Sequence, residues 1–146
     1  MRSFDPRRVG SLECRAWETY YRRKWGAFLA ASVGLVHAAF RMSWPRTLVG
    51  AWLVLRANMV WAPFPDNDPD KARALMRRFY QLLRKSETAS FDPTRASELE
   101  VEWWRVHREH QHAGVEAGSD PANPLLAEER ALLVRSYAAL LAAVHR

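Results

Sequence analysis

Prolines that follow a capping residue divide this chain into helical segments. At four places a Pro begins a segment with helical periodicity, and a Ser, Asp or Asn stands one or two residues before it. These places are Ser43-Trp44-Pro45, Asp68-Pro69, Asp92-Pro93 and Asn123-Pro124. Proline is favoured in the first turn of a helix, and Ser, Asp and Asn are favoured as its cap. No convincing period-two pattern of apolar residues occurs, so we expect helices and no strands.

These boundaries predict five helices. They cover residues 11–41, 43–61, 68–85, 92–114 and 123 to near the end of the chain. We expect Pro63 and Pro65 to stop the second helix, and Asp68 to cap the third. A length of 146 residues suits one domain with a single core. We therefore predict an all-α bundle in one domain, residues 1–146, in which residues 1–10 are loosely ordered.

The segment 43–61 is apolar on nearly every side. Its apolar residues form two stripes, one of Leu48, Trp52, Leu55 and Met59 and another of Val49, Leu53 and Val60. A helix that is apolar all round is typically buried, so we expect this one to be central and packed on both sides. Arg56 lies between the stripes, and a buried guanidinium needs a carboxylate such as Glu18 or Glu100 beside it.

Charge and hydropathy limit where the protein can reside. The chain has 22 Lys and Arg, of which 19 are Arg, against 16 Asp and Glu, for a net charge of +6. The longest uncharged run, residues 25–40, is shorter than the roughly 20 residues that span a bilayer. The first ten residues lack the apolar core of a secretory signal. We expect no transmembrane segment and a cytoplasmic location.

The helix expected over 92–114 carries the residues best suited to chemistry. Its inward face holds Glu100, His107 and His110 between Trp103 and Trp104. Polar groups in such a place need partners, so a Trp-lined polar pocket for a small molecule is the first functional hypothesis. His107 and His110 are three residues apart and can reach one transition-metal ion. If the protein is an enzyme, we expect His107 to be the general acid or base and Glu100 to orient it.

Four residues from other segments complete this expected pocket. They are Glu18 and Arg56, which would close its shell, and Asp66 and Asn67, in the loop before the third helix. Loops on rigid scaffolds often carry binding groups, although an Asx turn would also explain Asp66 and Asn67. A structural alternative stands beside the pocket. In it, the same Glu, His and Arg side chains form a buried network that sets helix register without catalysis.

A second functional hypothesis uses the helix expected over 68–85. Its outer side collects Lys71, Arg73, Arg77, Arg78, Arg84 and Lys85, with no acid after Asp70. Such a stripe suits nucleic-acid phosphates, anionic lipid or an acidic partner, or is simply a solvated face. No nucleic-acid-binding motif or interleaved aromatic residue accompanies it, which argues against nucleic acid. The hypothesis is a non-catalytic interaction or scaffold module with a protein partner or a second copy. Seven Trp are many for one core, and exposed ones would suit an interface.

Overall fold

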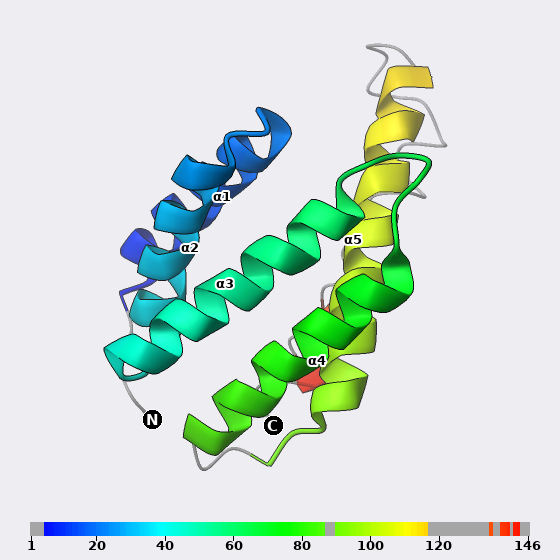
Figure 1. Ribbon diagram of the computed structural model, residues 1–146. Coiled ribbons are helices and arrows are strands. Elements are labelled where there is room, and N and C mark those ends of the chain that lie inside the picture. The colour runs from blue at the N-terminus through cyan, green and yellow to red at the C-terminus, as the bar shows by residue number, and fades with distance from the viewer. Residues whose placement is uncertain (1–4, 87–89, 117–134, 136–137, 141, 144–146) are drawn as a thin grey trace. The chain divides into compact units, whose positions relative to one another are not determined.

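The computed structural model describes residues 5–86, 90–116, 135, 138–140 and 142–143. All regular structure within them is α-helical, which confirms the predicted all-α bundle (Figure 1). The helices are α1 (Pro6–Tyr21), α2 (Trp25–Phe40), α3 (Trp44–Trp61), α4 (Pro69–Ser86) and α5 (Pro93–Glu116). The chain forms two compact units, which we call unit 1 (residues 1–88) and unit 2 (residues 89–146).

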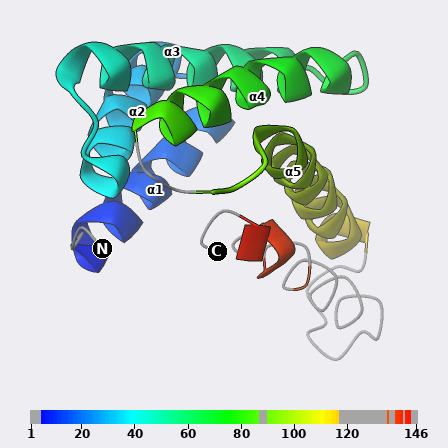
Figure 2. The same cartoon turned by 90° about the horizontal axis from the view of Figure 1, so that it is seen from below.

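In unit 1, each helix packs on the next one along the chain. Helix α1 lies on α2, α2 on α3, and α3 on α4. Helices α3 and α4 run antiparallel and side by side in both views (Figures 1 and 2). The guanidinium of Arg46, near the start of α3, donates a hydrogen bond of 3.3 Å to Ser86 Oγ at the end of α4. Helix α3 is therefore packed between α2 and α4, as expected of a helix with neighbours on two sides, and α2 is packed in the same way between α1 and α3.

The core of unit 1 is built from apolar side chains of all four helices. Its members include Ala16, Tyr20, Phe28, Val36, Leu53, Leu55, Met76, Phe79 and Leu83. Gly50 marks a close approach between α3 and α4. A Cβ atom added there would lie 3.3 Å from the Phe79 ring and 3.4 Å from the Met42 side chain. Any larger residue at position 50 would push these side chains aside.

The helix predicted over 11–41 is in fact two helices, α1 and α2. They are separated at Arg22–Lys24, where Arg23 takes a left-handed conformation with φ of 54°. The Lys24 amide donates to the Thr19 carbonyl at 2.9 Å, which closes the end of α1. The Arg23 guanidinium donates to the Ala62 carbonyl at 2.9 Å and ties this turn to the end of α3. Left-handed backbone is uncommon outside glycine, so apolar periodicity did not reveal the break.

The proline rule for helix starts is confirmed for α3, α4 and α5. Asp68 accepts a hydrogen bond from the Lys71 amide at 2.9 Å, and Asp92 accepts one from the Thr94 amide at 2.9 Å. Ser43 precedes α3 without a side-chain capping bond. The same signal at Asp5-Pro6 starts α1, since Asp5 accepts from two amides of the first turn. The predicted start at residue 11 is therefore five residues late.

Unit 2 is described mainly through α5. Its buried residues include Ala96, Val101, Trp104 and Val106. On its exposed side, Arg105 forms ion pairs with Glu102, at 2.6 Å, and with Glu109. These two carboxylates raise the pKa of Arg105 above its ordinary value. The helix predicted from residue 123 lies largely outside the described residues, although 135, 138–140 and 142–143 are helical.

Candidate functional site

Helix α3 exposes a broad apolar side, which we call the open face. It consists of Trp44, Leu48, Val49, Trp52 and Met59, which are 58%, 54%, 51%, 50% and 39% exposed. Among the helices of unit 1, α1 and α2 lie on the opposite side of the α3–α4 pair (Figure 2). The prediction that both apolar stripes of α3 are buried is therefore wrong for Leu48, Val49, Trp52 and Met59, while Leu53 and Leu55 are buried as expected.

The open face runs along one side of α3. At 100° per residue, its five side chains fall within an arc of about 140°. From Trp44 to Met59 the strip is about 22 Å long, at 1.5 Å per residue. The His37 ring stacks on Trp44 with centroids 4.0 Å apart and an interplanar angle of 12°, which orients that indole. The strip therefore presents large apolar side chains in one direction.

Arg56 belongs to this exposed strip and not to a buried network. Its side chain is exposed, and its guanidinium lies over the Trp52 ring, 5.9 Å from the centroid. Glu18, the partner expected from unit 1, instead pairs with Arg22 at 3.1 Å, where both side chains are exposed. The expected burial of Arg56 is wrong, and Glu18, one of the two carboxylates offered as its partner, pairs with Arg22 instead. An Arg over an exposed Trp keeps its charge in water while its stem covers apolar surface.

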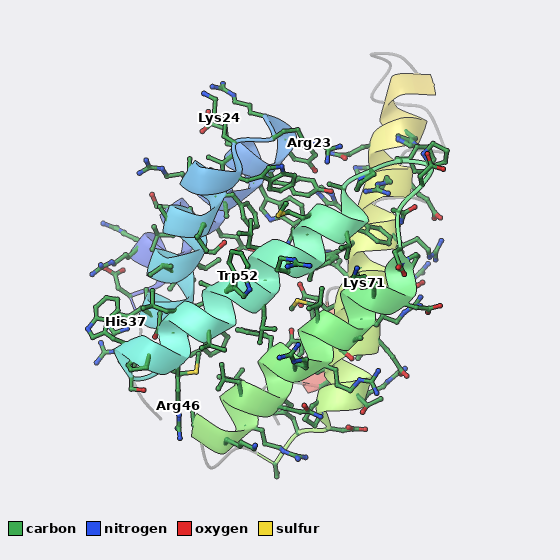
Figure 3. All side chains as sticks on the ribbon, viewed as in Figure 1. Arg23, Lys24, His37, Arg46, Trp52 and Lys71 are labelled. Atoms are coloured by element: carbon green, nitrogen blue, oxygen red, sulfur yellow. The ribbon has the colours of Figure 1, made fainter. Side chains whose placement is uncertain are left out.

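Helix α4 adds a row of cations beside the open face. Lys71, Arg78 and Lys85 are exposed and recur at seven-residue intervals, so they follow one edge of the helix. On the surface of α4, this edge lies next to Ser86, and Ser86 contacts α3 through its hydrogen bond from Arg46. It lies opposite the buried face of α4. Figure 3 shows Trp52 on α3 and Lys71 on the neighbouring α4. We call these three residues the basic edge.

The two helices contain almost no negative charge. Helices α3 and α4 together hold eight Lys and Arg and a single acid, Asp70, which pairs with Arg73 at 2.7 Å. Within the described ranges, the three residues of the basic edge take part in no ion pair. Their charge is therefore directed to solvent or to a partner.

The histidines predicted to carry chemistry lie on α5 with some of their expected neighbours. Trp104 Nε1 donates a hydrogen bond of 2.9 Å to Glu100 Oε1, and the Trp103 and His107 rings are 5.8 Å apart. Burial lowers the pKa of His107 from its ordinary value, and the nearby charge of His110 lowers it further. His110 Nδ1 is buried and has no hydrogen-bond partner among the described residues. The structure thus brings the five α5 residues of the predicted pocket onto one helix segment.

The remaining candidates belong to unit 1. Glu18 is exposed on α1, and in the loop after α3 Asp66 is exposed and Asn67 half-buried. That loop is closed by the Asp68 amide, which donates to the Val60 carbonyl at 3.0 Å. Across the residues that the structure describes, no three His, Cys, Asp or Glu side chains gather where they could hold a metal ion. Among the described residues, the predicted metal site therefore has only two ligands, His107 and His110.

Sequence reasoning missed the open face because it treated every apolar residue of α3 as core. One signal could have found it. On the helical wheel, Arg56 falls between Trp52 and Val49, and a lone Arg in an apolar stripe marks a side that reaches water.

Two further findings bear on function. None of the helices in the described parts of the chain is both long and apolar enough to cross a membrane. The sequence matches no known protein family, and no curated protein and no solved structure is detectably similar to it. Function is therefore inferred from the residues and their geometry.

Proposed function

We propose that unit 1 is a non-catalytic docking module that binds a negatively charged surface through the open face and the basic edge. One observation carries the proposal: five large apolar side chains are exposed in a single strip. Soluble proteins rarely expose contiguous apolar surface of this kind unless it contacts a partner. The basic edge sets the sign of that partner, because complementary charge steers association and selects against wrong partners.

The shape of the face also favours docking over enclosure of a small molecule. Ligand pockets are concave and bury most of the ligand surface. The open face is instead an exposed side of one helix, and such a surface meets a partner over an extended area. The cytoplasm remains the proposed location, where the membrane leaflet and many proteins offer negative charge.

The test is a charge reversal with a matched control. The variant Lys71→Glu, Arg78→Glu, Lys85→Glu removes the basic edge. The control Arg7→Glu, Arg8→Glu, Arg15→Glu makes the same change in net charge on exposed positions of α1. Binding of the whole 146-residue chain to polyglutamate and to anionic vesicles is measured over a salt series. Each cation near such a surface contributes about 1 kcal/mol, so the basic-edge variant should lose at least about tenfold in affinity.

The control should lose much less, because α1 lies away from the open face. Equal losses in both variants would mean that only net charge matters, and would overturn the docking site. Absence of binding to either anionic probe at low salt would overturn the proposal as a whole.

We propose a second candidate function for α5, the binding of a small ligand beside Glu100, His107 and His110, or of one transition-metal ion by the pair His107 and His110. The observation that favours it is the buried His110 Nδ1, which has no hydrogen-bond partner in the part of the chain that the structure describes. Zinc titration of untagged protein, followed by calorimetry, tests this function. The wild type should bind zinc, and the His107→Ala, His110→Ala variant should not. Equal zinc binding by both proteins would remove this candidate.

A further inference from the structure

We infer that the negatively charged surface is an anionic lipid bilayer, on which α3 lies flat with its open face in the interfacial region. This inference rests on the docking function proposed above and specifies its partner. The open face contains two tryptophans, Trp44 and Trp52. They lie on the same i, i+4 row of the helix, with Leu48 between them. Trp is enriched where a membrane meets water, because its large ring is apolar while its N–H donates a hydrogen bond.

The arrangement of charge around the open face matches an interfacial helix. Such helices carry Trp, Phe or Leu on one side and Lys or Arg around it, and they lie in the plane of the membrane. Here the apolar strip is bordered by the basic edge, Lys71, Arg78 and Lys85, on α4. Apolar side chains would enter the boundary of the acyl chains, and the cations would remain among lipid phosphates. A bilayer surface satisfies both sets of groups at once.

Arg56 fits the same surface. Its guanidinium lies over the Trp52 ring, 5.9 Å from the centroid, within the apolar strip. In this position the stem of the side chain covers apolar surface while the charged end stays free to reach a phosphate. Against a flat apolar protein surface, the same guanidinium would be desolvated without a partner, which costs free energy.

A second copy of the chain suits this face less well. Unit 1 contains 16 Lys and Arg and seven Asp and Glu, so it carries a net charge of +9. Two open faces brought together would also bring two basic edges close to each other. Like charges brought close together repel each other. The described residues of α3 and α4 supply only one acid, Asp70, to offset this repulsion.

The first experiment separates apolar insertion from simple charge attraction. The variant Leu48→Gln, Trp52→Gln removes apolar surface without changing charge. The control Tyr21→Gln removes an aromatic ring that is 46% exposed on α1. Both are compared with wild type by cosedimentation with phosphatidylcholine vesicles that contain phosphatidylserine, and by binding to polyglutamate. Circular dichroism checks that each variant is folded.

We expect the double variant to lose at least about tenfold in affinity for the vesicles, because burial of these side chains drives insertion. Its affinity for polyglutamate should change by less than about threefold, since electrostatic attraction is unchanged. The Tyr21→Gln control should resemble wild type on both probes. A double variant that binds the vesicles like wild type would overturn the membrane inference and leave the docking function intact.

The second experiment locates the open face directly. Cys14 is the single cysteine and is exposed on α1, so it offers a built-in control position. An environment-sensitive dye is attached either to Cys14 of the wild type or through the Leu48→Cys, Cys14→Ser variant. With anionic vesicles, the dye at position 48 should shift to the blue and be quenched by lipids that carry spin labels on their acyl chains. The dye at position 14 should show neither effect.

The remaining outcomes each identify a different occupant. A concentration-dependent shift at position 48 without vesicles would assign the open face to a second copy and overturn the membrane inference. Binding to polyglutamate but not to anionic vesicles would assign it to an acidic protein and also overturn the inference. Binding to neither would overturn the docking function itself, so the failures of the two proposals are distinguishable.

Discussion

Unit 1 and unit 2 carry opposite net charges and use them differently. Unit 1 has a net charge of +9, whereas unit 2, with six Lys and Arg against nine Asp and Glu, has a net charge of −3. On α5, Arg105 is satisfied by two carboxylates of its own helix. On α4, the described residues give Lys71, Arg78 and Lys85 no such partner. The overall +6 is therefore the sum of a basic unit 1 and an acidic unit 2, and among the described residues the cations of the basic edge differ from Arg105 in having no ion-pair partner.

The largest expected effect separates the core of unit 1 from its open face. Leu55 and Leu48 are on the same helix, but Leu55 is 4% exposed and Leu48 is 54% exposed. We expect Leu55→Ala to lower the free energy of unfolding by about 2–5 kcal/mol, because it leaves a cavity. Leu48→Ala should change it by less than about 0.5 kcal/mol. Urea denaturation measures both, and equal losses would show that the open face is covered within the folded protein.

The next-largest effect concerns the capping of helix starts, which the two units share. Asp68 caps α4 in unit 1, and Asp92 caps α5 in unit 2, each through one backbone amide at 2.9 Å. Asp68→Ala and Asp92→Ala should each cost about 1 kcal/mol of stability. Ser43→Ala is the control, since Ser43 makes no side-chain capping bond. Thermal denaturation that ranks Ser43→Ala with the two Asp variants would contradict the assignment of the caps.

A smaller effect concerns the paired charge of unit 2. Arg105 and its partners Glu102 and Glu109 are each about half exposed, so solvent screens their attraction. We expect Arg105→Gln to cost about 0.5 kcal/mol at low salt and less at high salt. It should leave binding to anionic vesicles unchanged, in contrast to Lys71→Gln. A loss of vesicle binding in Arg105→Gln would break the distinction between the two units.

The smallest effect is a pH dependence that arises in unit 2. Burial and the charge of His110 hold the pKa of His107 below its usual value near 6.5 in the folded protein. As the pH falls through about 6.5, the unfolded chain binds a proton at His107 before the folded protein does, so stability decreases. His107→Gln should flatten this part of the stability profile between pH 7.5 and 5.5, values chosen to lie about one unit on either side of that pKa. His112→Gln, an exposed position on the same helix, should not.

Much of the fold could be predicted because helix starts are local events. An Asp before a Pro satisfies first-turn amides and presets the backbone, whatever the rest of the chain does. The break at Arg23 could not be predicted in this way. Arg23 and Arg41 both take positive φ angles, of 54° and 48°, at the ends of α1 and α2. Glycine or asparagine would have signalled such a turn, whereas the Arg23 conformation is held by a bond to Ala62, 39 residues away.

The candidate site shows the same division. The order of residues alone places Glu100, Trp103, Trp104, His107 and His110 on one helix, because each lies within a few turns of the next. It also collects the cations of α4 on one side of that helix. It does not say whether Trp52 or Leu55 faces the core, since both are apolar and only the neighbouring helices distinguish them.

The amino-acid sequence by itself determined the all-α class, the proline-capped starts of α3, α4 and α5, and the imbalance of charge between residues 1–88 and 89–146. These properties depend on contacts within a few residues or on counting. Only the tertiary structure decided which apolar residues of α3 became core and which became surface. The physical reason is that α2 and α4 cover two sides of α3 and no helix of unit 1 covers the third, so Trp44, Leu48 and Trp52 remain exposed next to the basic edge.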